Sequence, residues 1–221
     1  RNQVFKTTLD GKILLTINAP QDLEVYKEKA NFKPTETAIA PDGSIYVADG
    51  YGAQMITHFD PQGNLVNAFG GYGTAQAQFQ NAHGICLDQR FDKTPTLLIT
   101  AREQQAVKRF SLEGEHLNTI SFPGANICRP VIHNDNCYFS VLKSTGVNNE
   151  DSGFVMVLND KDEVVSCPGA SFNETANGQM HYSQNLRLFK YPHDVCIDKD
   201  ENIYVAQWNS DNTYPIKLER V

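Results

Sequence analysis

Two of the six histidines stand in the same kind of place in the sequence. His83 and His193 each come directly before an alternating apolar run, Gly84–Leu87 and Asp194–Ile197. Imidazole nitrogens bind zinc, and three of them with an open fourth position form a catalytic zinc site. Two histidines give two of those three ligands, and the third would lie before Arg1. The alternative is that both rings only cap the inner ends of strands through hydrogen bonds, and spacing alone leaves both interpretations open.

Side chains suited to proton transfer and to anion binding follow the ends of other strands. Tyr51 and Arg102 stand at matching places one repeat apart, and Trp208 holds the same place two repeats after Arg102. A phenol can take up a proton, a guanidinium can hold a carboxylate, and an indole can stack on a substrate. Ordinary packing and rim salt bridges are the alternative for each of the three.

A repeating sequence must position these candidates. Segments that start at Thr35 and at His83 each give four β-rich runs, and a segment that starts at His193 gives three. Gly, Asp and Asn mark turns at intervals of about 8–12 residues, which is typical of antiparallel sheet. A weaker copy runs from Cys128 to Cys167. Four strands in about 45 residues indicate one blade of a β-propeller.

The sequence therefore predicts an all-β chain that folds as one β-propeller domain of four-stranded antiparallel blades. The repeats predict a partial blade over residues 1–20, full blades over 31–72, 79–123 and 124–170, and a last blade over 188–221. Small propellers of this type usually have six blades, and a propeller closes to protect its edges, so we expect an N-terminal portion to be missing. The polar insertion Pro168–Lys190 is expected to be a loop or a lid.

The blade pattern also assigns the remaining polar candidates. Asp194 points away from the His193 ring because successive side chains of a strand alternate, and it could hold a hard cation in the central channel or cap a strand end. Asp49 ends a strand and is expected to accept backbone hydrogen bonds. The other four histidines are expected to be surface or structural residues: His58, His116, His133 and His181.

Composition excludes several classes of protein. The 221 residues carry 19 Lys+Arg against 26 Asp+Glu, a net charge of −7 without a basic cluster, which argues against a nucleic-acid partner. No apolar run approaches the roughly 20 residues of a membrane-spanning helix. The five cysteines include no CxxC pair. Cys86 and Cys196 lie in alternating apolar runs and are expected to be small buried side chains.

Several motifs in this pattern resemble the NHL family of β-propellers, and more closely the peptidyl-α-hydroxyglycine α-amidating lyase domain. The resemblance runs from Asn2 to Val221. The motifs that carry it are Gln3–Lys6, Val47–Tyr51, the FQNAHGICLD sequence around His83, Gly153–Met156 and Tyr191–Asp194.

The resemblance implies a role for most of the candidates. In that family three histidines hold a zinc ion, and His83 and His193 match two of them. Tyr51 matches a tyrosine proposed as general base, and Arg102 matches a rim arginine. Asp194 matches a carboxylate that binds a structural calcium ion. The copy from Cys128 and the polar insertion diverge most from the family, so the substrate is the least transferable implication.

Two functions from different classes fit these observations. The first is a zinc-dependent lyase that cleaves a carbinolamide, the hydroxylated C-terminal glycine of a peptide, or another small hydroxylated substrate. The second is a non-enzymatic NHL-repeat propeller that binds a protein or a glycan. Neither involves nucleic acid or a membrane span. The resemblance implies a protein that works outside the cytoplasm or is secreted.

Overall fold

The chain folds into antiparallel β-sheets in the computed structural model, which describes residues 2–28, 31–90, 94–145, 151–184 and 186–220. Within these ranges there is no α-helix, and the 3-10 turns are short, among them η1 (Glu24–Tyr26) and η3 (Arg102–Gln104). None of the described helices is long and apolar enough to cross a membrane. The all-β prediction is therefore confirmed. Arg1 and Val221, the outer limits of the predicted first and last blades, lie outside the described residues.

Four-stranded antiparallel sheets make up the middle of the chain, and their strands pair in chain order. The first sheet contains β3 (Glu36–Ile39), β4 (Ile45–Ala48), β5 (Met55–Phe59) and β6 (Leu65–Gly70). The second contains β7 (Ala82–Asp88), β8 (Thr96–Ala101), β9 (Ala106–Phe110) and β10 (His116–Ser121). The third contains β11 (Ala125–His133), β12 (Asn136–Ser144), β13 (Phe154–Leu158) and β14 (Val164–Ser166).

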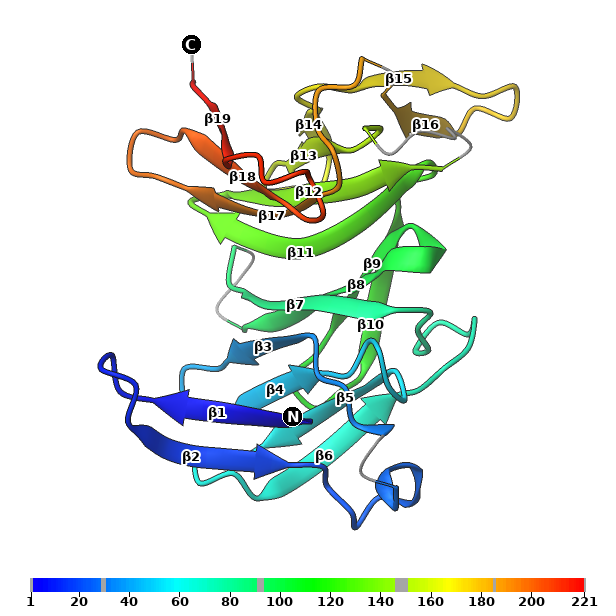
Figure 1. Cartoon of the computed structure of the whole chain (residues 1–221). Coiled ribbons are helices and arrows are strands. Elements are labelled where there is room, and N and C mark those ends of the chain that lie inside the picture. The colour runs from blue at the N-terminus through cyan, green and yellow to red at the C-terminus, as the bar shows by residue number, and fades with distance from the viewer. Residues whose placement is uncertain (1, 29–30, 91–93, 146–150, 185, 221) are drawn as a thin grey trace.

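Smaller sheets flank these three. The pair β1 (Gln3–Thr7) and β2 (Ile13–Asn18) comes before them, and β17 (Pro192–Ile197), β18 (Ile203–Gln207) and β19 (Ile216–Leu218) come after. The sheets follow one another along the molecule from β1–β2 at one end to β17–β19 at the other (Figure 1). The first strands of the three four-stranded sheets and of the β17–β19 sheet lie side by side, because β7 lies against both β3 and β11, and β11 lies against β17. Side chains from several sheets can therefore meet along this row of inner strands.

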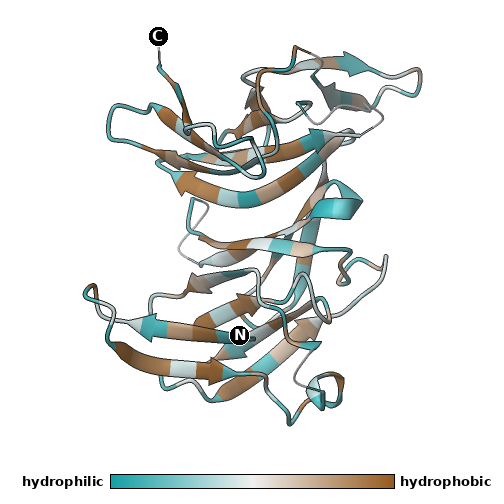
Figure 2. Ribbon diagram, in the orientation of Figure 1, coloured by the Kyte–Doolittle hydropathy of each residue, from teal (hydrophilic) through white to brown (hydrophobic). Residues whose placement is uncertain are grey.

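The apolar core lies between successive sheets. Brown apolar positions recur along the strands in Figure 2, as expected for sheets that pack face to face. Tyr46, Ile85 and Phe110 belong to the cluster between the first two four-stranded sheets, and Leu98 and Phe139 belong to the next one. Each fully buried side chain of this size contributes about 1.5–3 kcal/mol, so this packing holds the sheets, and hence their inner strands, in place.

The outer hairpins share one turn chemistry. Asp60 accepts the backbone amides two and four residues later at 2.9 and 2.8 Å, and Gly63 takes the left-handed conformation with φ +88°. Equivalent acceptors of the amide four residues later occur in the other outer hairpins: Thr8, Ser111 and Asn159. Asp162 stands where Gly63 stands in its own turn, with φ +60°. The predicted turns are thus local hydrogen-bonded structures that fix the strand pairing.

The insertion Pro168–Lys190, for which the sequence predicts a loop or a lid, is partly regular. It contains a two-stranded antiparallel hairpin, β15 (Ser171–Glu174) and β16 (Met180–Ser183). The Tyr182 ring packs against Phe122, with ring centroids 6.3 Å apart, whereas β15 is exposed along its length. Few side chains of this hairpin are buried, so its polar sequence lacks the apolar pattern from which the other strands were predicted.

Candidate metal centre

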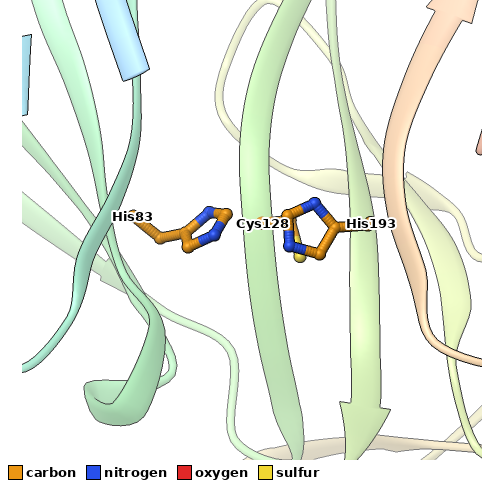
Figure 3. Close-up of side chains that lie close together, drawn as sticks. All are labelled: His83, Cys128 and His193. Carbon is orange, nitrogen blue, oxygen red and sulfur yellow. The ribbon is translucent and has the colours of Figure 1, made fainter. Parts of the chain in front are cut away.

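The two predicted histidines meet across the row of inner strands. His83 comes from β7 and His193 from β17, and their ring centroids lie 4.8 Å apart with the ring planes at 72°. The rings point toward one another in Figure 3. His83 is only 6% exposed. The strands that carry these rings belong to different sheets, so only the packing of the sheets brings the two imidazoles together.

A cysteine that sequence reasoning did not select completes the cluster. Cys128 lies on β11, the strand between β7 and β17, and is fully buried. One donor atom from each of His83, Cys128 and His193 lies within 4.8 Å of the others. In the sequence Cys128 marks only the start of the divergent copy, and this divergence hides its place on an inner strand.

The prediction that Cys196 is a small buried side chain is wrong. It is exposed on β17, although Val195 beside it is buried. Alternation along the strand turns the two side chains to opposite faces, so the apolar run is not buried as a whole. Cys86 is partly buried and packs against the core between the second and third four-stranded sheets.

Close approach of the inner strands depends on a glycine after the first histidine. A Cβ atom on Gly84 would lie 2.5 Å from the Cα of Arg129 on β11. No larger residue fits at that distance without moving one of the backbones. Gly84 therefore lets β7 approach β11 next to both His83 and Cys128.

Tyr51 reaches the cluster from the end of the preceding sheet. Its hydroxyl lies 3.1 Å from Nε2 of His83, and the rings meet edge to face with centroids 5.6 Å apart. Tyr51 as a whole is 53% exposed. A Cβ atom on Gly50 would lie 2.3 Å from the Ala82 carbonyl oxygen, so the glycine before Tyr51 is needed for this contact.

Arg102 contacts the sulfur of the cluster. It opens η3 after β8, is 4% exposed, and places Nη2 3.2 Å from Sγ of Cys128. Its Nε is buried and has no hydrogen-bond partner in the described structure. A buried donor without a partner costs about 1–3 kcal/mol. The buried Nε of Arg102 could therefore donate a hydrogen bond to an anionic ligand.

The cluster is suited to a zinc ion. Burial lowers the pKa of His83 to about 3, and Arg102 and His193 add to this effect. Burial and Arg102 also lower the pKa of His193, so both rings are neutral near pH 7 and keep a lone pair. Nδ1 of His83 is buried without a hydrogen-bond partner. Neutral imidazoles and a sulfur are ligands that zinc prefers.

Asp194 lies beside an arginine. Its Oδ1 accepts hydrogen bonds from Nε of Arg129 at 3.1 Å and from the amide of Val195 at 2.8 Å. Nη1 of Arg129 also lies 3.7 Å from a carboxylate oxygen of Glu36 on β3. The guanidinium thus lies between the carboxylates of Glu36 and Asp194, and calcium binding by Asp194 stays a prediction.

The other candidates lie in separate surroundings. Trp208 is 59% exposed and packs against Tyr191, with ring centroids 5.7 Å apart. Asp49 is buried and accepts the backbone amides of Lys33 at 2.6 Å and Ala53 at 2.7 Å, as its strand-end position predicts. The described contacts of Trp208 fit the packing alternative.

Comparison with known proteins supports the fold and a distant relationship. No family model matches the chain. The sequence is 21% identical to peptidylglycine alpha-amidating monooxygenase of Rattus norvegicus over 227 residues, which cover 98% of this chain and 21% of that protein. The chain therefore spans about a fifth of the length of this curated relative.

Solved structures define the fold more directly. Virginiamycin B lyase from Staphylococcus aureus aligns with a TM-score of 0.57 and 15% identity, over 93% of this chain and 56% of that one. The Dos1 propeller aligns with a TM-score of 0.54 and 12% identity, over 100% of this chain and 54% of that one. The fold is a β-propeller. At identities of 15% and 12% these structures show the fold alone, and the six-blade count stays a prediction.

Proposed function

We propose that the chain contributes the active site of a zinc-dependent lyase that acts on a carbinolamide or a similar small hydroxylated substrate. The observation that carries this proposal is the hydrogen-bond contact of 3.1 Å between Tyr51 and His83, whose ring meets that of His193. A proton-transfer group is thereby next to two neutral imidazoles that could hold a metal ion. The similarity to a peptide-amidating protein supports the substrate class.

The residues would divide the reaction between them. His83 and His193 would hold the zinc ion, which when bound supplies a Lewis acid that polarises the substrate hydroxyl. Tyr51, as its phenolate, would take the hydroxyl proton. The hydroxyl oxygen then forms a carbonyl, the C–N bond breaks with its electron pair on nitrogen, and the nitrogen takes up a proton. The products are an amide and an aldehyde, which is glyoxylate when the substrate is a hydroxylated glycine.

Arg102 would orient the substrate. Its buried Nε has no partner in the described structure, and a guanidinium binds a carboxylate through charge-assisted hydrogen bonds. A C-terminal carboxylate held there would direct the neighbouring carbinol carbon toward Tyr51. The substrate would thus be a small molecule or a peptide C-terminus. We place this activity outside the cytoplasm, on the resemblance to secreted lyases.

Replacement of the Tyr51 hydroxyl tests the proposal. In the full-length protein, Tyr51→Phe should lower kcat for an α-hydroxyglycine-extended peptide by about 10²–10⁴-fold, because the proton acceptor is lost while the ring remains. The assay measures glyoxylate release. Tyr214→Phe, at a 90% exposed tyrosine, is the matched control and should keep full activity.

Two results would overturn the lyase assignment. One is unchanged turnover in Tyr51→Phe, and the other is full turnover in protein stripped of metal. A protein that binds a glycan or a protein but releases no glyoxylate would instead favour the non-enzymatic propeller.

A further inference from the structure

We propose that Cys128 is a thiolate ligand of the metal centre, and that Arg102 positions its sulfur. The donor set would then be two imidazoles and one sulfur, from His83, His193 and Cys128. This inference rests on the proposed function because it names a further ligand of the same centre. It differs from the ligand set that the sequence resemblance implies, in which all three ligands are histidines.

The position of Cys128 is the first observation in its favour. Its strand β11 lies between the strands that carry the two histidines, and its donor atom lies within 4.8 Å of theirs. The three candidate ligands come from three adjacent inner strands and lie close together (Figure 3). Mixed sulfur and imidazole sets with an open position occur in catalytic zinc sites.

The charge on Arg102 is the second observation. Its guanidinium is almost fully buried, and among the described residues it forms no ion pair with a carboxylate. An unpaired buried charge costs several kcal/mol. The Cys128 sulfur lies 3.2 Å from Nη2, so the buried guanidinium directly faces the proposed ligand atom. A coordinating sulfur carries negative charge, and Arg102 is therefore placed to stabilise it and to fix its position.

The roles proposed for Arg102 use different atoms. Nη2 donates to the sulfur, whereas Nε has no partner in the described structure and could donate to a substrate carboxylate. Partners that orient metal ligands change metal affinity by about 10–100-fold when they are removed. Arg102 would therefore act on the centre through Cys128 as a positioning residue.

Cobalt substitution tests the ligand assignment without depending on turnover. The full-length protein is loaded with Co²⁺, and its near-ultraviolet spectrum is recorded. We expect an intense sulfur-to-cobalt charge-transfer band that disappears in Cys128→Ser and persists in Cys196→Ser, the exposed cysteine on β17. Arg102→Gln should keep the band but weaken Co²⁺ binding about 10–100-fold.

A measurement on the unaltered protein covers the case in which Cys128→Ser does not fold. X-ray absorption of the zinc-loaded protein should show one sulfur at about 2.3 Å together with nitrogen neighbours at about 2.0 Å. Cobalt bound through His83, without a sulfur band and without a sulfur neighbour, would overturn the role of Cys128 and leave the lyase proposal standing. A protein that binds no metal at all would overturn both.

Discussion

At the scale of single residues, Gln54 sets the distance between Tyr51 and His83. Its Nε2 donates to the Gly50 carbonyl at 2.7 Å, and its Oε1 accepts from the Ala82 amide at 2.9 Å. These backbone groups belong to the direct neighbours of Tyr51 and His83. The buried amide therefore joins the end of one sheet to the start of the next at the point where Tyr51 and His83 meet.

Removal of this amide should loosen the site and destabilise the fold. Gln54→Leu leaves a buried carbonyl and a buried amide without partners, each of which costs about 1–3 kcal/mol. We expect the free energy of unfolding in urea to fall by about 2–4 kcal/mol, and zinc affinity to fall with it. Gln62→Leu, at an exposed glutamine of a turn, should change neither quantity. Equal stability of the two variants would contradict this role.

At the scale of elements, the outer hairpins depend on their first turn residue. Ser111 is typical, because its Oγ accepts the amides of Glu113 and Glu115 at 3.2 Å each. The residue three positions later adopts the left-handed conformation, as Gly114 does with φ +91°. This chemistry is local in sequence, which explains why the turns could be predicted without knowledge of the packing.

Loss of the Ser111 hydroxyl should lower the stability of the protein modestly. Ser111→Ala removes both side-chain hydrogen bonds of the β9–β10 turn, so we expect the free energy of unfolding to fall by about 1 kcal/mol. Urea titration would measure the change. Ser121→Ala, at the exposed end of β10, is the comparison and should shift the midpoint much less. A smaller loss in Ser111→Ala than in Ser121→Ala would count against the turn as a source of stability.

At the scale of the whole molecule, an ion cluster joins two of the four-stranded sheets. Asp88 on β7 pairs with Arg90 at 2.9 Å and with Arg109 at 2.8 Å, and Asp162 pairs with the same two arginines at 2.8 and 2.7 Å. Asp162 belongs to the β13–β14 turn of the next sheet and replaces the glycine of the other turns. Its strained φ is thus tolerated where a carboxylate links neighbouring sheets.

The cluster should make stability depend on pH. Burial alone would raise the pKa of Asp88, but hydrogen bonds from Arg90 and Arg109 outweigh it and hold the pKa below its ordinary value. A carboxyl whose pKa is lower in the folded than in the unfolded protein stabilises the fold at pH values above its unfolded pKa of about 3.9. This stabilisation is lost as the pH falls through the pKa of the folded protein. Thermal unfolding between neutral pH and about pH 3 should show this loss.

Asp88→Asn isolates the contribution of this carboxylate. Breaking a buried ion pair costs about 3–5 kcal/mol, so the variant should be less stable at neutral pH and should lose less stability on acidification. Lys199→Ala, at an exposed lysine, serves as the control. Parallel pH profiles for the Asp88 variant and the unaltered protein would show that the cluster does not set acid stability.

Features that depend on interactions local in sequence could be predicted, whereas features that depend on contacts between sheets could not. Strands and turns were predictable because their signals lie within a few residues, as at Asp60 and Ser111. His83 and His193 could be paired because they occupy equivalent positions in repeats. Cys128 could not, because its repeat has diverged and its closeness to the histidines depends on the packing of three sheets. The exposure of Cys196 depends on the face that its strand turns to the core.

The exposure of Tyr51 has a consequence for how the site meets solvent. Its hydroxyl contacts a buried imidazole, but about half of the residue is exposed. In the proposed reaction Tyr51 would therefore stand at the boundary between the buried histidines and solvent. A bound substrate that covers the exposed part of this residue would separate the proton-transfer group from bulk water.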